Sequence, residues 1–497
     1  MQNIVSRIKR EVVSEVVSKT QLEFASQIST NLGNKIYLKR EDLTPVHSFK
    51  LRGAYHKIRT LSPEQLAQGV ITCSAGNHAQ GVAFSAKKLG ISAVIVMPKI
   101  TPKIKVDAVK SWGAEVILFG NNYDEAFDFS QNIAKQKGYT FIHAFDDVDV
   151  IAGQGTIAYE LLEQLEEIDY IFIPVGGGGL ITGIASVIKT LRPEIKIIGV
   201  EPVGSAALTR SITSDTHAVL EEVDTFAEGV AVKKVGTENL RIAKTLVDDT
   251  VLVSNDEMCA AIKDIYNQNR HIVEPSGALA LAGIKRYVVD KHLHGNNIIS
   301  IVSGANMNFD RLRYVAERAD LGEHNEVIIA VTIPEKAGSF LNFCQLLEQH
   351  AITEFNYRYT PSDQARIFVG VALSKGLDEK QALISKLTQS FDVLDMSDNS
   401  IAKSHIRYMV GGRAEVENEA LYRFEFPERP GALLNFLQKV GNKWNISLFH
   451  YRNHGADFGR VLIGLQVDNV EEIERSFDEL GYFYQNETNN KAYQYFL

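Results

Sequence analysis

Short apolar runs alternate with longer amphipathic stretches over roughly the first 320 residues. The amphipathic stretches carry apolar residues at helical spacing, as in Ala152–Leu165. This alternation predicts α/β units around a mostly parallel sheet. The predicted strands are Ile91–Met97, Val116–Phe119, Thr140–Phe145, Tyr170–Val175, Lys196–Val200 and Ile298–Val302.

Beyond about Glu326 the pattern changes, and the new pattern occurs twice. IPEKAGSFLNF at 333–343 matches FPERPGALLNF at 426–436. ITEFNYR at 352–358 matches ISLFHYR at 446–452, and RIFVGVAL at 366–373 matches RVLIGLQV at 460–467, each pair 94 residues apart. Three matched blocks in one order predict a tandem duplication of a β-α-β-β unit, each copy a small sheet with helices on one face.

Composition and charge narrow the class of protein. Of 497 residues, 45% are hydrophobic and 23% charged, as in soluble globular proteins. The net charge of −9 argues against general nucleic-acid binding. No apolar run is long enough to span a membrane, and the N-terminus lacks the apolar segment of a secretory signal. Three isolated cysteines, Cys73, Cys259 and Cys344, predict neither disulfides nor a zinc site and fit the cytoplasm.

The first motif with chemical potential is SFKLRGA at 48–54, which follows a strand-like segment and a turn at Pro45. A helix is predicted from near Ser48, with Ser48 as its N-cap. Lys50 then lies in the first turn, where the helix dipole disfavours an ammonium by about 0.3–1 kcal/mol. A lysine that loses its proton easily is a Schiff-base nucleophile. Most isolated lysines are simply exposed, so this motif needs support from others.

The second motif, Ser74-Ala75-Gly76-Asn77-His78, follows a predicted strand at Val70–Thr72 and opens a helix over 79–89. Its tight turn would direct backbone N–H groups at an anion, and a substrate carboxylate suits that place. Asn77 has donor and acceptor groups for a cofactor hydroxyl. His78 is a candidate general base, although a histidine at a helix start is more often structural.

Two further motifs follow buried strands. Gly176, Gly177, Gly178 and Gly179 precede a helix pattern that opens at Leu180, so backbone N–H groups there could converge on a phosphate. No Lys-Ser/Thr follows, which disfavours ATP. Ser303, in SGAN at the end of Ile298–Val302, offers a hydroxyl at the strand edge where ligands of open α/β sheets bind. Alone, either motif could be an ordinary turn.

Taken together and in this order, these motifs closely resemble those of the fold-type II (tryptophan-synthase-β-like) pyridoxal-phosphate (PLP) enzymes, and among them the serine/threonine dehydratases. IAGQGT at 151–156, AEGVAVKKVG at 227–236 and EPSGALALAG at 274–283 strengthen the resemblance. The C-terminal repeats resemble ACT-like regulatory domains, and the combination resembles biosynthetic threonine deaminases. It implies a PLP-dependent catalytic region over 1–320 and ACT-like domains over 326–398 and 419–491. Departures are small: TQL at 20–22 and Ala144 replace TPL and Pro in many relatives.

The resemblance also implies roles for individual residues. Lys50 corresponds to the Schiff-base lysine, Asn77 to the partner of the cofactor 3′ oxygen, and Ser303 to the partner of the pyridine nitrogen. The phosphate loop corresponds to Gly176, Gly177, Gly178, Gly179 and Leu180, and the substrate-carboxylate loop to Ser74, Ala75, Gly76, Asn77 and His78.

The implied reaction is β-elimination from L-threonine to 2-oxobutanoate and ammonia, with Lys50 as the general base. A hydroxyl partner at Ser303 would leave the ring nitrogen largely unprotonated, which favours elimination over transamination. Isoleucine is the implied inhibitor, valine the effector that relieves inhibition, and a homotetramer the implied assembly. Candidate effector residues lie in matching blocks of the repeats: Phe355, Tyr357 and Arg358, and Phe449, Tyr451 and Arg452.

Other functions share parts of this pattern. Catabolic serine/threonine dehydratases and serine racemases have the core motifs but usually lack the double repeat. Threonine synthase needs a second phosphate motif, which the sequence does not show. An amino-acid sensor without catalysis would not need Lys50, Asn77 and the glycine run together.

Overall fold

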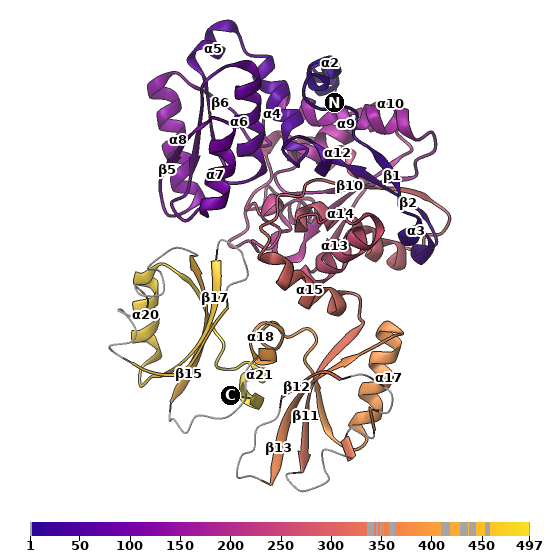
Figure 1. The fold of residues 1–497 in the computed structure, drawn as a ribbon, viewed down its shortest axis with the longest axis vertical. Coiled ribbons are helices and arrows are strands. Elements are labelled where there is room, and N and C mark those ends of the chain that lie inside the picture. Colours follow the sequence, from indigo (N-terminus) through magenta and orange to yellow (C-terminus); the bar gives the residue numbers. More distant parts are fainter. Residues whose placement is uncertain are drawn as a thin grey trace. The chain divides into compact units, whose positions relative to one another are not determined.

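The computed structural model describes residues 2–334, 342–343, 346–347, 350, 352–356, 363–408, 418–427, 436, 444–452 and 458–496. The chain divides into two compact units, Met1–Met307 and Asn308–Leu497 (Figure 1).

The first unit holds two sheets. Six strands lie in the order β1-β2-β10-β7-β8-β9, all parallel to their neighbours except that β1 is antiparallel to β2. Four parallel strands form the order β5-β4-β3-β6. The strands are β1 Leu22–Phe24, β2 Lys35–Arg40, β3 Val70–Cys73, β4 Ala93–Met97, β5 Glu115–Leu118, β6 Thr140–Phe141, β7 Tyr170–Pro174, β8 Lys196–Pro202, β9 Asp249–Val253 and β10 Asn297–Val302.

Helices follow most of these strands, as the alternating pattern predicts (Figure 1). The helices of this unit are α1 Gln2–Val5, α2 Arg10–Ser14, α3 Ser26–Leu32, α4 Lys50–Arg59, α5 Pro63–Gln68, α6 Asn77–Leu89, α7 Lys103–Ser111, α8 Tyr123–Lys137, α9 Val148–Gln164, α10 Gly179–Leu191, α11 Ala207–Thr213, α12 Thr237–Leu246, α13 Asn255–Asn269 and α14 Pro275–Asp290, with 3₁₀ turns η1 Glu41–Leu43, η2 Val203–Ser205 and η3 Glu228–Val230.

Strand β7 shows why apolar residues occupy successive positions in the central strands. Ile171 and Ile173 belong to the core that includes α10, whereas the ring of Phe172 lies 5.3 Å from that of Tyr287 in α14. Both faces of the sheet are therefore covered, as is usual for parallel sheets.

The strands predicted in this unit are confirmed, with two differences in extent and burial. β5 lies at an edge of its sheet and is not fully buried, and β6 has only two residues. The chain beyond β6 leaves the sheet and reaches the Lys50 region, where a turn is needed instead of a strand.

The second unit contains two four-stranded antiparallel sheets with the same strand order, β12-β13-β11-β14 and β16-β17-β15-β18. Each copy has a helix and a fourth strand beyond the predicted unit. The elements are α15 Arg311–Gly322, β11 Glu326–Pro334, β12 Ile352–Asn356, β13 Gln364–Ala372, α17 Gly376–Thr388, β14 Asp392–Asp395, α18 Ser400–Ser404, η4 Ile406–Tyr408, β15 Glu419–Pro427, β16 Asn445–Arg452, β17 Phe458–Gln466, α20 Val470–Leu480, β18 Phe483–Asn486 and α21 Lys491–Phe496.

The duplication extends to a backbone irregularity. The register of β12 on β13 shifts between Ile352 and Glu354, and that of β16 on β17 between Ile446 and Leu448. Both shifts fall at positions 94 residues apart, the same offset as the sequence repeat. A β-bulge kept in both copies supports descent from one ancestral unit.

Helices cover more than one face of these sheets, contrary to the expectation of a single covered face. Ile329 in β11 packs in the core of its own copy, whereas its neighbour Ile328 packs in a second cluster. That second cluster also contains Leu421 of β15 and residues of α18 and α21. Burial on both faces explains why VIIAVTI is apolar, except at Thr332, and does not alternate.

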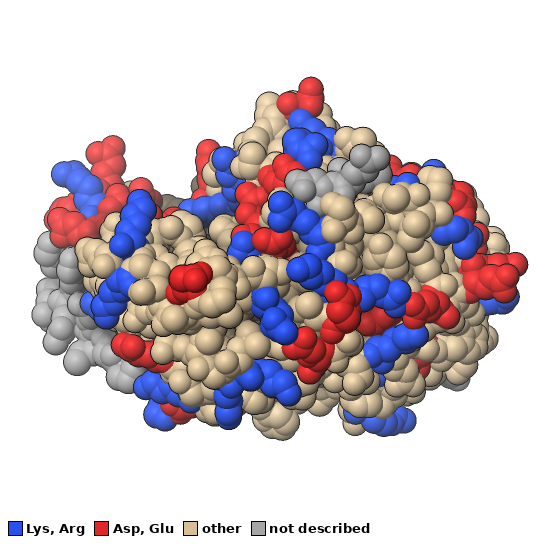
Figure 2. Space-filling view, turned by 90° about the horizontal axis from the view of Figure 1, so that it is seen from above, with Lys and Arg blue, Asp and Glu red and all other residues tan. Residues whose placement is uncertain are grey.

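Acidic and basic side chains are intermixed on the face shown in Figure 2. Among the described residues drawn there, positive charge is not gathered into a stripe of the kind that follows a nucleic-acid backbone. No helix in the described part of the chain is long and apolar enough to cross a membrane.

Candidate active site

Lys50 is the first residue of α4, at the carboxyl end of β2. The prediction that Ser48 caps this helix was wrong: Phe49 is the N-cap residue, and no side chain caps the helix. Ser48 is instead fully buried in an antiparallel bridge with Gly304, and Phe49 N–H donates to Ser303 O at 3.1 Å. This bridge fixes the start of α4 against the end of β10.

The Lys50 side chain is partly buried, and its Nζ donates to the Ala144 carbonyl at 2.9 Å. Loss of solvent around the ammonium lowers the pKa of Lys50 to about 8, against the opposing charge of Glu274. An appreciable fraction of the amine is therefore unprotonated near neutral pH, which a nucleophile or general base requires.

The residue two positions further along α4 belongs to a buried ion network. Arg52 pairs with Glu41 at 2.7 Å and with Glu160 of α9 at 2.6 Å, and Glu160 also pairs with Lys39 of β2 at 2.6 Å. Two positive and two negative charges balance, and the network ties α4 to β2, η1 and α9. It holds the Lys50-bearing helix in place.

The glycine run at 176–179 leaves β7 and enters α10. A Cβ on Gly177 would lie 2.1 Å from Cγ of the Phe145 ring, and Gly178 has a φ of +93°, so neither position accepts a side chain without strain. The residues from Gly176 to Leu180 are buried, yet no described residue accepts a hydrogen bond from their backbone N–H groups. Buried N–H groups without acceptors form an anion site at the start of α10.

Asn239 of α12 connects this loop to the segment that holds Lys50. Its Nδ2 donates to the carbonyls of Phe145 and Gly177, each at 2.9 Å. Phe145 directly follows Ala144, the acceptor of Lys50 Nζ. The fully buried Asn239 therefore sets the anion loop relative to the lysine.

The segment from Ser74 to His78 leaves the carboxyl end of β3, and α6 starts at Asn77. His78 is buried, and its Nε2 lies 3.0 Å from Ile142 O, to which it donates when protonated there. Burial and the nearby Lys50 charge lower the pKa of His78 to about 3, so the imidazole is neutral. The side chain is structural, and only its backbone N–H is suited to a carboxylate.

Asn77 lies in a chain of polar contacts. Asn306 Nδ2 donates to Asn77 Oδ1 at 2.7 Å, and Asn77 Nδ2 donates to Glu274 Oε1 at 2.7 Å. Asn77 Nδ2 therefore keeps its second hydrogen for another acceptor. Ser303 Oγ donates to Ser276 O at 3.0 Å, so Ser303 can accept a further bond without turning from that carbonyl.

The structure thus brings the four predicted motifs together at the carboxyl edges of parallel strands, where open α/β sheets bind ligands. Sequence reasoning gave no role to Glu274, Asn306 or Asn239. Glu274 opens a motif quoted for the resemblance and Asn306 ends SGAN, so position in a motif was an available signal. Asn239 lies outside every motif, and only its contacts reveal it.

The effector residues stay a prediction, because the structure describes none of their side chains. Tyr357 and Arg358 lie outside the described residues, and only the backbone of Phe355, Phe449, Tyr451 and Arg452 is described, in β12 and β16.

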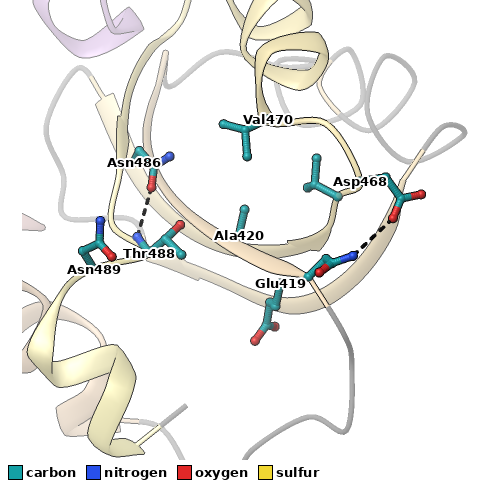
Figure 3. A pocket seen from close by; sticks show the side chains of 9 residues that line it. Glu419, Ala420, Asp468, Val470, Asn486, Thr488 and Asn489 are labelled. Atoms are coloured by element: carbon teal, nitrogen blue, oxygen red, sulfur yellow. Dashed lines mark hydrogen bonds between the residues drawn. The ribbon is translucent and has the colours of Figure 1, made fainter.

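A pocket of about 550 Å³ lies elsewhere in the second copy, between the start of β15, the start of α20 and the end of β18 (Figure 3). None of its described lining residues is basic, whereas Glu419 and Asp468 are acidic. Its described lining residues offer no positive charge to an amino-acid carboxylate.

The site as a whole defines a class. A lysine with a lowered pKa suits covalent attachment of an aldehyde, and the orphan N–H groups at α10 suit a phosphate. Pyridoxal phosphate carries both groups. On this fold the arrangement is that of a fold-type II PLP enzyme, and a family model described as "Pyridoxal-phosphate dependent enzyme" matches residues 13–304.

The particular family follows from further comparisons. A model described as "C-terminal regulatory domain of Threonine dehydratase" matches residues 317–406 and again 410–497. The biosynthetic L-threonine dehydratase of Pasteurella multocida is 54% identical over 98% of this chain and 95% of its own length. The biosynthetic L-threonine dehydratase of Escherichia coli is 51% identical over 99% of this chain and 96% of its own length. The chain belongs to the threonine dehydratases, which are PLP-dependent lyases with C-terminal regulatory domains, and the predicted fold class and cofactor are confirmed.

Solved structures of related enzymes superpose on part of the chain. The processed form of threonine deaminase isoform 2 from Solanum lycopersicum superposes with a TM-score of 0.63 at 47% identity, covering 64% of this chain and 88% of that one. Serine racemase from Dictyostelium discoideum superposes with a TM-score of 0.58 at 33% identity, covering 62% of this chain and 98% of that one.

Proposed function

We propose that this chain converts L-threonine into 2-oxobutanoate and ammonia, the committed step of isoleucine biosynthesis, with PLP attached to Lys50. The observation that carries the proposal is a partly buried Lys50 amine, with a pKa of about 8, next to a glycine loop whose backbone N–H groups have no described acceptor. Lys50 Nζ donates to Ala144 O, and Asn239 joins the neighbouring Phe145 carbonyl to that of Gly177 in the loop. The names of the bacterial relatives support threonine as the substrate.

The residues divide the work by chemistry. The backbone from Gly176 to Leu180 would hold the phosphate, Asn77 Nδ2 would donate to the 3′ oxygen, and Ser303 Oγ would be the partner of the ring nitrogen. Bound PLP supplies electron withdrawal that makes the Cα proton of the substrate acidic.

Lys50 then carries the proton. The unprotonated Lys50 amine can take the Cα proton, because its pKa of about 8 leaves part of it unprotonated near neutral pH. The Ser74 N–H donates to Val96 O and the Gly76 N–H to Ser74 Oγ, so the backbone N–H groups of Ala75, Asn77 and His78 are the ones that would hold the substrate carboxylate. The Cα–H and Cβ–O bonds break, so the Cα proton and the hydroxyl group together account for the water that is lost. The released enamine then takes up one water and yields 2-oxobutanoate and ammonia.

The test uses purified full-length protein with PLP. Visible absorbance that borohydride abolishes, with tritium from borotritide recovered on the peptide containing Lys50, is the expected result. Lys50→Ala should lose that absorbance and threonine turnover together. Near-normal turnover by Lys50→Ala would refute the assignment.

We also propose feedback control by the second unit. Isoleucine is the expected inhibitor and valine the expected antagonist, bound near Ile333–Phe343 and Phe355–Arg358 and near Phe426–Phe436 and Phe449–Arg452. A homotetramer in the cytoplasm is the proposed setting. The match of a regulatory-domain model to both copies supports this control, and coupling requires that the effector bind two states of the enzyme unequally.

Deleting the chain after Asp320 should keep threonine turnover and abolish isoleucine inhibition. Inhibition that survives the deletion would place the effector site in the first unit. Turnover of L-serine, and production of D-serine, distinguish the proposed reaction from that of a serine dehydratase or serine racemase.

A further inference from the structure

Glu274 is a buried carboxylate within the proposed active site, and the mechanism above gives it no role. It is 7% exposed, directly precedes α14, and accepts hydrogen bonds from Asn77 Nδ2 at 2.7 Å and from Ser276 Oγ at 2.8 Å. Both bonds go to Oε1, and no described residue donates to Oε2. Half of the carboxylate is therefore available to another partner.

The backbone around Glu274 is shaped to admit this carboxylate. A Cβ on Gly304 would lie 2.7 Å from Glu274 Oε1, and one on Gly229 would lie 2.5 Å from Ser276 Oγ. Glu274 N–H donates to Gly304 O at 3.2 Å, which ties the start of α14 to the end of β10. Two glycines and a backbone bond keep a charged group where an apolar side chain would otherwise pack.

We propose that Glu274 is a positioning residue of the active site: its carboxylate fixes the Asn77 amide and is the counter-charge for the Lys50 ammonium. The inference rests on the proposed function. Asn306 and Glu274 hold opposite ends of the Asn77 amide, so Nδ2 cannot turn away from the cofactor side. When Lys50 has taken a proton, the buried ammonium needs a negative charge nearby.

The electrostatics agree with this geometry. Burial lowers the pKa of Lys50, and Glu274 acts in the opposite direction, so the amine titrates near pH 8 and not lower. Burial raises the pKa of Glu274, while the bonds from Ser276 and Asn77 oppose that rise. Other charges that act on Glu274 are Glu228 and Lys105.

Two histidines also lie near the Lys50 amine. Burial lowers the pKa of His78 and of His143, and the positive charge of Lys50 lowers both pKa values further. They are therefore neutral near pH 8, which leaves Glu274 as the negative charge acting on Lys50.

The test follows the pH dependence of cofactor attachment to full-length protein freed of PLP, monitored by growth of visible absorbance. Glu274→Gln keeps the size and an acceptor oxygen but removes the charge. We expect the pH at which half of the protein has attached PLP, the midpoint, to fall by about 1 unit relative to wild type, because the Lys50 ammonium loses its counter-charge. Glu228→Gln removes a carboxylate that acts on Glu274 but is paired with Lys105, and it should leave the midpoint unchanged.

Glu274→Asp separates position from charge. The shorter side chain loses the bond from Asn77, so PLP affinity should fall about tenfold while the midpoint stays near that of wild type. Ser276→Ala serves if Glu274→Gln does not fold: without this donor Glu274 holds its proton more readily, and the midpoint should again fall.

The outcomes are distinguishable. Unchanged midpoints in Glu274→Gln and Ser276→Ala, with normal visible absorbance, would overturn the role of Glu274 and leave the proposed function intact. Wild-type protein that develops no visible absorbance with PLP would instead overturn the proposed function itself.

Discussion

Replacing Lys50 with methionine should make the cofactor-free protein more stable near neutral pH. A lysine with a pKa lowered from 10.5 to about 8 is still charged at pH 7, and the folded protein holds that charge in a site that disfavours it. Methionine has a similar length and no charge. Loss of catalysis should therefore accompany a gain in stability, as expected where a site is selected for function.

The magnitude follows from the pKa shift. Each pH unit between the unfolded and folded pKa values corresponds to about 1.4 kcal/mol in the free energy of unfolding. A lowering from 10.5 to about 8 therefore means that the charged Lys50 destabilises the folded protein by about 3 kcal/mol at most. The side chain is only partly buried, which reduces this figure, and Lys50→Met also loses the hydrogen bond from Nζ to Ala144 O, which contributes about 1 kcal/mol. We therefore expect Lys50→Met to raise the free energy of unfolding by about 1–2 kcal/mol.

The sign of the pH dependence is specific. Between about pH 8 and 10.5 the unfolded chain binds the Lys50 proton and the folded chain does not, so the stability of the wild type rises with pH across this window. The advantage of Lys50→Met should therefore be full below pH 8 and disappear by about pH 10.5.

Urea denaturation of the two cofactor-free proteins, at neutral pH and at alkaline pH, measures this difference. Lys39→Met is the matched control, because Lys39 is fully buried but pairs with Glu160 at 2.6 Å. That variant should lose stability, since it leaves part of the ion network without its partner. A Lys50→Met protein less stable than wild type at neutral pH, or an advantage that does not fade with pH, would refute the reasoning.

Three further predictions concern Asn239, Gly177 and Arg52, which position Lys50 and the glycine loop. Asn239→Ala should weaken PLP binding about 10- to 100-fold, because the partly buried Phe145 carbonyl loses its donor. Asn34→Ala, which removes similar bonds at the opposite edge of the sheet, should leave the PLP dissociation constant unchanged. Gly177→Ala should abolish PLP absorbance without unfolding, since its Cβ would overlap the Phe145 ring; unaltered binding would contradict the packing. Arg52→Met should lower the unfolding free energy by about 3–5 kcal/mol in urea melts, and a loss below about 1 kcal/mol would show that its carboxylate partners do not need it.

The strands and the repeat were predictable because the physical constraint acts on many residues at once. β4 and β10 are fully buried in parallel sheets, so every position of β4 is apolar and β10 is apolar except at Asn297 and Ser300. The repeat was visible because both copies keep the same core and even the same bulge. The fourth strands, β14 and β18, were missed because they are short and half-exposed.

The start of α4 shows where local rules fail. Ser48 is a favoured N-cap type three residues after a proline, yet it is buried in the bridge to Gly304, 256 positions away in sequence. Tertiary pairing with β10 outweighed the helix-capping preference of about 1 kcal/mol. Long-range pairing of this kind leaves no local signal in one sequence.

The residues that the motifs did not predict share a physical explanation. Lys50 and the N–H groups at 176–180, which were predicted, and Glu274, which was not, each place a charged or polar group where burial is unfavourable. Such groups keep their positions only if neighbouring residues fix them rigidly, and those neighbours need not belong to any motif. Asn239 in α12 and the ion network of Arg52 in α4 fix the glycine loop and the Lys50 helix in this way. Predicting a site from motifs therefore finds the groups that do chemistry, whereas the contacts in the structure identify the residues that make their placement possible.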